Sequence, residues 1–392
     1  MATGATLTRA GRANVRTAER AILVALDFGS EQYAESLAEL RLLAAGAGVE
    51  VVGVVRGRRA RPDPALFAGS GKVAEVAGVC AAAEANLVIF NHELTPAQQR
   101  NLERSLSCRV VDRTSLILDI FAQRASSHEG KVQVELAQLQ HLATRLVRGW
   151  THLERQRGGI GLRGPGETQL ETDRRLIGRR VKVLKERLTR LERQRTVQRR
   201  ARVRGEVLSV SLVGYTNAGK STLFNALTRA SAYAADQLFA TLDTTTRRMF
   251  LPEVGAITIS DTVGFIRELP HTLVAAFRAT LEETVRADLL LHVVDASSPT
   301  RDLQESEVDK VLAEIGAEKI PRLLVWNKID ANGATRGVDR DECGTIRRVR
   351  LSARTGDGLD DLRRALIEAA ASKAESRERQ KPADQSRHAH VD

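Results

Sequence analysis

The feature that most constrains the fold is a glycine-rich motif between an apolar segment and a helical one. Residues 214–221 read GYTNAGKS and match the pattern G-x-x-x-x-G-K-S. The apolar segment 207–214 leads into this motif, and the amphipathic segment TLFNALTR follows it. A phosphate-binding loop requires this strand-to-helix context, because its backbone N–H groups and the helix N-terminus bind phosphate oxygens. We therefore predict an α/β domain with a phosphate site at a strand end.

A second motif predicts a magnesium ion and a γ-phosphate at the same site. Lys220 is expected to reach the β- and γ-phosphates, and the Ser221 hydroxyl is expected to coordinate Mg²⁺. The segment DTVG, residues 261–264, ends the next apolar strand. Asp261 is placed there to hold the water shell of Mg²⁺, and the Gly264 N–H can meet the γ-phosphate.

Two later motifs predict that the base is guanine. The segment NKID, residues 327–330, ends another apolar strand. Asp330 can accept from the ring N–H and the exocyclic amine of guanine, Asn327 can meet the other edge of the base, and the Lys328 stem can pack on it. The segment SAR, residues 352–354, follows the last strand and can supply a backbone donor to the guanine oxygen. Ligands bind at such strand ends in open α/β sheets.

The rest of the chain predicts further domains around this one. Residues 206–370 form the nucleotide-binding domain, with strands expected at 207–214, 256–261, 289–295, 322–327 and 347–353. Residues 21–125 also alternate strands and helices, which predicts an N-terminal α/β domain with a largely parallel sheet. Residues 1–20 are expected to be a disordered basic tail, and residues 371–392 a polar tail.

Positive charge identifies a different kind of domain between these two. The chain carries a net charge of +11, and residues 174–204 alone carry +12. The apolar spacing in this segment is that of a paired helix, at Ile177, Val181, Leu184, Leu188 and Leu191. An upstream stretch has the same spacing, at Leu139, Ala143, Leu146, Trp150 and Leu153. We predict that residues 126–205 form an antiparallel hairpin of helices 130–156 and 168–203, suited to an anionic partner such as nucleic acid.

The connection between these helices is rich in glycine. Residues 158–166 read GGIGLRGPG and are flanked by Arg157, Arg163, Arg174 and Arg175. This segment is either a flexible turn or a tip that approaches another backbone closely. Three widely spaced cysteines argue against a disulfide scaffold or a zinc site and fit a reducing compartment.

The segment 236–249, DQLFATLDTTTRRM, lies between the phosphate loop and DTVG and is expected to close over the γ-phosphate. From spacing alone, the Mg²⁺ hydroxyl could come from any of four threonines: Thr241, Thr244, Thr245 and Thr246. Phe265 stands where many GTPases have a glutamine that orients the attacking water. We expect slow hydrolysis by the protein alone and acceleration by a partner.

At this point the sequence resembles the HflX family of translation-factor-class GTPases, over residues 21–370. The resemblance rests on PDPALFAGSGK (62–72), RGGIGLRGPGETQLETDRR (157–175), GYTNAGKS, DQLFATLDTTTRR and DTVGFIRELP (261–270). The usual ATLDPT of the family has Thr244 here in place of proline. Alignment on ATLD implies that Thr241 is the Mg²⁺ residue.

The resemblance implies a GTP-hydrolysing protein that binds the large ribosomal subunit and its rRNA and can split stalled ribosomes. It also implies that Asn217 can help hold K⁺, although this asparagine could instead only tolerate the backbone angles of the turn. The predicted catalytic residues are Lys220, Thr241 and Gly264, and the predicted metal-site residues are Ser221, Thr241 and Asp261. The predicted nucleotide-binding residues are Gly214, Tyr215, Thr216, Asn217, Ala218, Gly219, Lys220, Ser221, Thr222, Phe239, Ala240, Thr241, Leu242, Asp243, Asp261, Thr262, Val263, Gly264, Asn327, Lys328, Ile329, Asp330, Ser352, Ala353 and Arg354.

Two other functions stay open at this point. The first is an RNA-stimulated NTPase or helicase-like activity of the N-terminal domain, whose GSGK at 69–72 is a weak phosphate-loop match without the following Ser or Thr. The second is a ribosome-binding or assembly factor whose nucleotide state only gates docking. We expect a monomer without a membrane span in the cytoplasm, with attachment to the membrane surface as the alternative.

Overall fold

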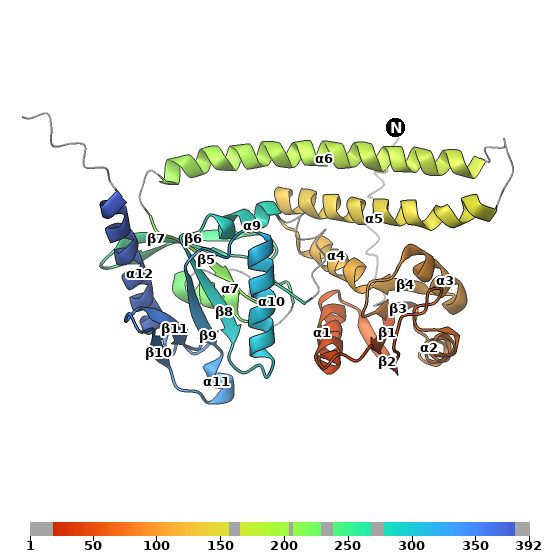
Figure 1. Cartoon of the computed structure of the whole chain (residues 1–392), viewed down its shortest axis with the longest axis horizontal. Coiled ribbons are helices and arrows are strands. Elements are labelled where there is room, and N and C mark those ends of the chain that lie inside the picture. Colours follow the sequence, from red (N-terminus) through yellow and green to blue (C-terminus); the bar gives the residue numbers. More distant parts are fainter. Residues whose placement is uncertain (1–18, 157–164, 204–206, 229–237, 268–277, 381–392) are drawn as a thin grey trace, which may run out of the picture. The chain divides into compact units, whose positions relative to one another are not determined.

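The computed structural model describes residues 19–156, 165–203, 207–228, 238–267 and 278–380. They fall into two compact units. The first ends at Arg113 and the second runs from Thr114, except that residues 95–97 belong to the second unit. Each unit contains one sheet with helices packed on it (Figure 1). The first unit and residues 114–125 of the second correspond to the predicted N-terminal α/β region.

The N-terminal sheet is entirely parallel, in the strand order β2-β1-β3-β4. Residues 21–26, AILVAL, are buried along their whole length, because a central parallel strand has both faces covered. The elements of this unit are β1 (Arg20–Asp27), α1 (Tyr33–Gly46), β2 (Glu50–Arg58), α2 (Ser70–Ala82), β3 (Leu87–Phe90), α3 (Pro96–Leu106) and β4 (Arg109–Asp112).

The second unit begins with α4 (Arg113–Arg124) and two long antiparallel helices, α5 (His128–Gln156) and α6 (Pro165–Val203) (Figure 1). The predicted hairpin is therefore present. An apolar seam joins the two helices and consists of Val132, Leu136, Leu184 and Leu188, with Leu139, Val181 and Leu191 at its margin. The seam on α5 starts two turns before Leu139, earlier than the sequence pattern predicts. The glycine-rich tip and the side chains of Trp150 and Leu153 lie outside the described residues.

The remainder of this unit is a seven-stranded sheet in the order β10-β11-β9-β8-β5-β7-β6. Its middle strands are parallel, and the two edge strands, β10 and β6, run antiparallel to their neighbours. The strands are β5 (Ser209–Val213), β6 (Thr245–Leu251), β7 (Gly255–Asp261), β8 (Leu289–Asp295), β9 (Arg322–Asn327), β10 (Gly337–Arg340) and β11 (Ile346–Arg350). The helices are α7 (Lys220–Thr228), α9 (Arg278–Val285), α10 (Arg301–Glu314), α11 (Ile329–Asn332) and α12 (Leu359–Gln380). The predicted α/β fold class is confirmed.

Two expectations for this domain are wrong. Residues 245–249, expected to belong to a closing loop, instead begin the edge strand β6, whose polar positions face outward while Met249 and Leu251 are buried. Residues 371–380, expected to be tail, continue α12, because Ala, Glu, Lys and Arg are strong helix formers. The tails 1–18 and 381–392 lie outside the described residues. Within the part that the structure covers, no helix is long and apolar enough to cross a membrane.

Candidate nucleotide site

The phosphate-loop motif lies between the end of β5 and the start of α7, as its sequence context predicts. Lys220 is buried, and its Nζ donates to the carbonyl oxygens of Gly214, at 3.1 Å, and Tyr215, at 2.8 Å. Burial lowers the pKa of Lys220 to about 8, against the attraction of Asp261. A phosphate group beside this ammonium would favour its charged form, so the loop is arranged to receive an anion.

Two glycines allow the loops around this lysine to approach one another. Gly219 has a φ of 92°, and a Cβ there would lie 2.2 Å from Nδ2 of Asn327. A Cβ on Gly264 would lie 2.8 Å from Cα of Thr216 and 2.9 Å from Nζ of Lys220. Any larger residue at 264 would therefore push the DTVG loop away from the phosphate loop.

Three side-chain oxygens meet beside the start of α7. The Ser221 hydroxyl donates to Oδ2 of Asp261 at 2.7 Å and lies 2.7 Å from Oγ1 of Thr241. Thr241 also donates to the same carboxylate oxygen, at 3.0 Å. The other oxygen of Asp261 is buried and has no hydrogen-bond partner. Hard oxygen donors of this kind are the ligands that Mg²⁺ takes, so the cluster fits that ion.

The geometry distinguishes between the four candidate threonines. Thr241 lies in the oxygen cluster, whereas Thr245 and Thr246 belong to β6. The hydroxyl of Thr246 lies 2.9 Å from that of Ser260 across the β6–β7 pair. Thr244 directly precedes the strand. Thr241 is the threonine in position to serve a metal.

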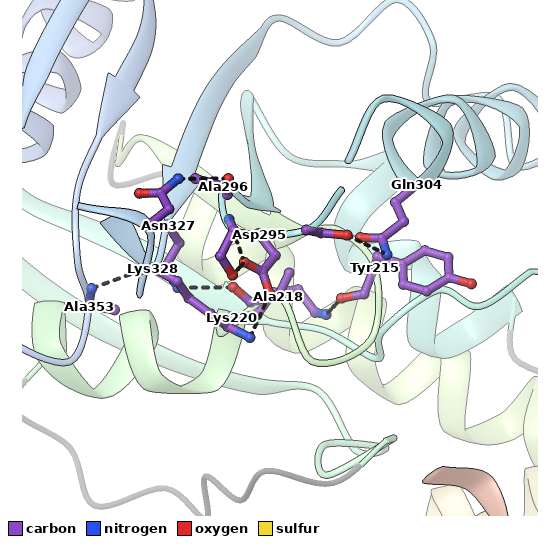
Figure 2. A network of polar contacts seen from close by, with 12 residues as sticks. Tyr215, Ala218, Lys220, Asp295, Ala296, Gln304, Asn327, Lys328 and Ala353 are labelled. Carbon is purple, nitrogen blue, oxygen red and sulfur yellow. Dashed lines mark hydrogen bonds and ion pairs between the residues drawn. The ribbon is translucent and has the colours of Figure 1, made fainter. Parts of the chain in front are cut away.

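Asn327 has a structural role that the sequence analysis does not assign. Its Nδ2 donates to the carbonyl oxygen of Ala218, and its Oδ1 accepts from the N–H of Ala353, both at 2.9 Å. Figure 2 shows this amide between the two loops. The side chain therefore ties the phosphate loop to the SAR loop. The Ala353 N–H already donates to Asn327. A hydrogen bond to a guanine oxygen would therefore have to come from another N–H group of the SAR loop.

Lys328 and Asp330 of the NKID motif lie directly after the end of β9 and in α11. Lys328 has a left-handed backbone, with a φ of 65°, and its ammonium lies 2.8 Å from a carboxylate oxygen of Asp295 (Figure 2). Asp330 is exposed in the short helix α11. This arrangement fixes the lysine stem and leaves the Asp330 carboxylate accessible to a ligand.

The residue in the place of the usual glutamine is buried. Phe265 is 1% exposed, so its ring belongs to the core. Its N–H donates to Gly214 at 3.1 Å, and its carbonyl oxygen accepts from Thr216 at 2.7 Å. The DTVG loop is therefore joined to the phosphate loop by backbone hydrogen bonds on both sides of Tyr215.

A cavity beside Lys220 collects many of the predicted residues. It is lined by Thr216, Asn217, Gly219, Lys220, Ser221, Thr222, Phe239, Ala240, Thr241, Thr262 and Gly264. Other predicted nucleotide ligands are not part of this lining, among them Leu242 and Asp243. Leu242 is buried, and the carboxylate of Asp243 accepts hydrogen bonds from Ser126 and Ser127. The Asp243 side chain is therefore engaged by the residues that precede α5, and a contact between Asp243 and the nucleotide stays a prediction.

The GSGK segment of the N-terminal unit forms the start of α2. Lys72 Nζ donates to the carbonyl oxygen of Arg56 at 2.9 Å and pairs with Glu75 at 2.6 Å. This lysine is paired with a carboxylate of its own helix, whereas Lys220 donates to carbonyl oxygens of the phosphate loop.

Curated relatives are similar along most of the chain. GTPase HflX of Escherichia coli (strain K12) is 58% identical over 351 residues, which are 89% of this chain and 82% of the relative. The chain belongs to the HflX family of GTPases. GTPase HflX of Caldanaerobacter subterraneus is 49% identical over 90% of this chain and 80% of the relative. Like the HflX GTPases, this chain binds and hydrolyses GTP.

Family profiles also match three successive segments. They are described as GTP-binding GTPase N-terminal (34–122), GTP-binding GTPase Middle Region (124–202) and 50S ribosome-binding GTPase (209–328). Among solved structures, a GTP-binding protein from the archaeon Sulfolobus solfataricus in complex with GDP is 24% identical. That comparison covers 90% of this chain and 99% of the other, with a TM-score of 0.47.

Proposed function

We propose that this HflX-family GTPase binds the large ribosomal subunit through the basic face of α6 and uses GTP hydrolysis to control that contact. The observation that carries the proposal is a long basic helix in the same chain as a GTP site. Exposed basic side chains cover α6 at Arg174, Arg175, Arg179, Arg180, Lys182, Lys185, Arg187, Arg190 and Arg193. Arg180 pairs with Glu135 of α5 at 2.7 Å, which leaves most of this face for a partner.

The chemistry of this face suits RNA. Structured RNA is recognised largely through its phosphates and shape, and guanidinium groups bind phosphate oxygens in pairs. The description of the third matching profile, 50S ribosome-binding GTPase, supports the same partner. We therefore propose that α6 contacts the rRNA of the large subunit.

For hydrolysis, we propose that Lys220 binds the β- and γ-phosphates and that Gly264 donates its N–H to the γ-phosphate. Ser221 and Thr241 would hold Mg²⁺, and Asp261 would bind its water shell. The ion would neutralise charge on the phosphates. Asp330 would read guanine, while Asn327 keeps the surrounding loops together.

The attacking water needs a partner that Phe265 cannot supply, since a buried aromatic ring offers no hydrogen bond to it. We propose that the isolated protein is slow and that ribosome binding orders the residues around the water. Asn217, which lines the site and has a φ of 61°, is proposed to help hold K⁺ near the phosphates. A monovalent cation there would stabilise charge in the transition state.

Co-sedimentation with purified 50S subunits tests the proposal. The key variant carries Arg179→Gln, Lys182→Gln, Arg187→Gln and Arg190→Gln on α6. The control carries Arg41→Gln, Arg104→Gln, Lys319→Gln and Arg336→Gln, which are also exposed. The α6 variant should bind subunits at least ~10-fold more weakly and with a shallower salt dependence, at unchanged GDP affinity.

Equal binding by the two quadruple variants would contradict the role of α6. Turnover with and without 50S subunits tests the stimulation, and the absence of acceleration would contradict it. Light scattering of 70S ribosomes with GTP or a non-hydrolysable analogue distinguishes splitting from docking alone.

A further inference from the structure

The segment 239–243 joins the metal-site cluster to the start of the helical hairpin. Thr241, in its middle, lies within hydrogen-bond distance of Ser221 and Asp261. Two residues later, the side chain of Asp243 contacts the start of α5 rather than the nucleotide cavity. One short stretch of backbone therefore carries contacts to two different parts of the second unit.

The Asp243 carboxylate is held by four hydrogen bonds from the two residues that precede α5. Oδ2 accepts from the N–H of Ser126 at 2.9 Å, from its hydroxyl at 2.7 Å and from the N–H of Ser127 at 2.7 Å. Oδ1 accepts from the Ser127 hydroxyl at 2.5 Å. Burial alone would raise the pKa of Asp243, but the hydrogen bonds from Ser127 and Ser126 outweigh it and hold the pKa below its usual value.

The same carboxylate supports the capping of α5. The Ser127 hydroxyl accepts from the N–H of Gly130 at 2.8 Å, so Ser127 caps the first turn while it donates to Asp243. A negative charge is also favourable at a helix N-terminus, where N–H groups have no partner within the helix. Asp243 therefore acts as a cap supplied by a segment that is remote in sequence.

Two further contacts, at Gly130 and at Phe239, also join the segment 239–243 to α4 and α5. A Cβ on Gly130 would lie 2.1 Å from Oδ1 of Asp243, so a glycine is needed in the first turn of α5. The ring of Phe239 packs edge-on against Phe121 of α4, with centroids 4.7 Å apart. The segment is thus attached to α4 and α5 at both ends, with Thr241 between the two attachments.

We propose that Asp243 is a positioning residue that places Thr241 at the metal site by anchoring its segment to the start of α5. The proposal rests on the role of Thr241 given above. Two residues of extended chain span at most about 7 Å, so Asp243 and Thr241 cannot move independently over a large distance. Release of Thr241 when the γ-phosphate is lost loosens the cap of α5, and displacement of α5 by a bound partner shifts Thr241. The hairpin and the nucleotide are coupled in both directions, as linkage requires.

Steady-state kinetics of the full chain test the positioning role. Asp243→Asn should lower kcat for GTP about tenfold, because a misplaced group loses catalytic contribution, while GDP affinity stays within about twofold. The control Asp341→Asn removes a carboxylate that accepts backbone hydrogen bonds in the β10–β11 turn and should leave kcat unchanged. Ser127→Ala combined with Asp243→Asn should cost little more than Asp243→Asn alone, because both changes break the same contact.

Hydrogen exchange tests the coupling. If Asp243 only stabilised the fold, the exchange rates at the start of α5 would not depend on the bound nucleotide. In the wild type, amides 126–131 should exchange at least ~10-fold more slowly with a GTP analogue and Mg²⁺ than with GDP, since two of them donate to Asp243. Asp243→Asn and Gly130→Ala should abolish this difference. Gly178→Ala, at an open position in α6, should keep it.

Equal exchange in the two nucleotide states of the wild type, or a normal kcat in Asp243→Asn, would overturn the inference. Thr241→Ala separates this failure from that of the proposed site. If Thr241→Ala lowers kcat and Asp243→Asn does not, the metal site stands and only the anchoring role is wrong. If neither variant affects kcat, the site assignment itself is wrong.

Discussion

Asn327 holds the phosphate loop through a hydrogen bond from its Nδ2 to the carbonyl oxygen of Ala218, at 2.9 Å. The same amide accepts the N–H of Ala353 from the loop after β11. One buried side chain thus joins loops that follow three different strands. Its position explains why an asparagine can be needed at this motif even without a direct contact to the base.

Removal of this amide should weaken nucleotide binding. Asn327→Ala leaves a buried carbonyl oxygen and a buried N–H without partners, each at a cost of about 1–3 kcal/mol. We expect GDP affinity to fall at least ~10-fold, measured by calorimetry. Asn101→Ala removes a similar side-chain bond, to Ala65 of the N-terminal unit at 3.0 Å, and serves as the control. Unchanged affinity in Asn327→Ala would show that the hydrogen bonds from Asn327 to the two loops are not needed for nucleotide binding.

The base preference should depend on the charge of Asp330. Asp330→Asn replaces an acceptor of two guanine N–H groups with an amide that can donate to the oxygen of xanthine. We expect a loss of ~10–100-fold in GDP affinity and a gain for XDP, measured by competition with a fluorescent nucleotide. Asp360→Asn, on the surface of α12, should change neither affinity. Retention of full guanine preference in Asp330→Asn would place base recognition elsewhere.

The nucleotide-binding domain should lose stability in mild acid through His292 of β8. Burial lowers the pKa of this histidine to about 4, despite the attraction of Asp309. The unfolded chain therefore binds a proton below pH ~6.5 that the folded domain does not take up, so stability falls as the pH drops from about 6.5 towards 4. This loss amounts to at most ~3 kcal/mol for one group.

His292→Leu should flatten that pH dependence. Urea unfolding at pH 7.5 and pH 5 can be followed by the fluorescence of Trp326 on the neighbouring strand β9, in a Trp150→Phe background. The histidine protein should lose more stability between the two values than the leucine variant. An equal loss in both would assign the acid sensitivity to other groups.

Potassium dependence can separate the two roles considered for Asn217. We expect faster GTP hydrolysis in KCl than in NaCl at equal ionic strength. Asn217→Gly preserves the left-handed backbone that the φ of 61° requires but removes the side-chain oxygen. Loss of the KCl advantage in this variant would support cation binding, whereas its retention would assign Asn217 to the turn alone.

Sequence patterns predict the buried parts of this protein well, because largely apolar runs such as 289–294, broken only by His292, are typical of covered parallel strands. They fail at β6, where Thr245 and Thr246 begin an edge strand whose outward side is polar. They also do not predict the contact of Asp243 with Ser127, because these residues lie 116 positions apart in sequence. The hydrogen bonds of Asn327 to Ala218 and Ala353 are missed for a similar reason, since base recognition already accounts for its motif.

The two backbone hydrogen bonds of Phe265 have a consequence for how the protein senses GTP. They attach the residue directly after the DTVG motif to residues 214 and 216, so this side of the γ-phosphate site cannot move away without breaking two backbone hydrogen bonds. The opposite side is held by the oxygen contacts of Thr241 and by the anchor at α5. Loss of the γ-phosphate should therefore open the site on one side only. Gly264 should stay in place, whereas Thr241 and the segment that joins it to the start of α5 should move.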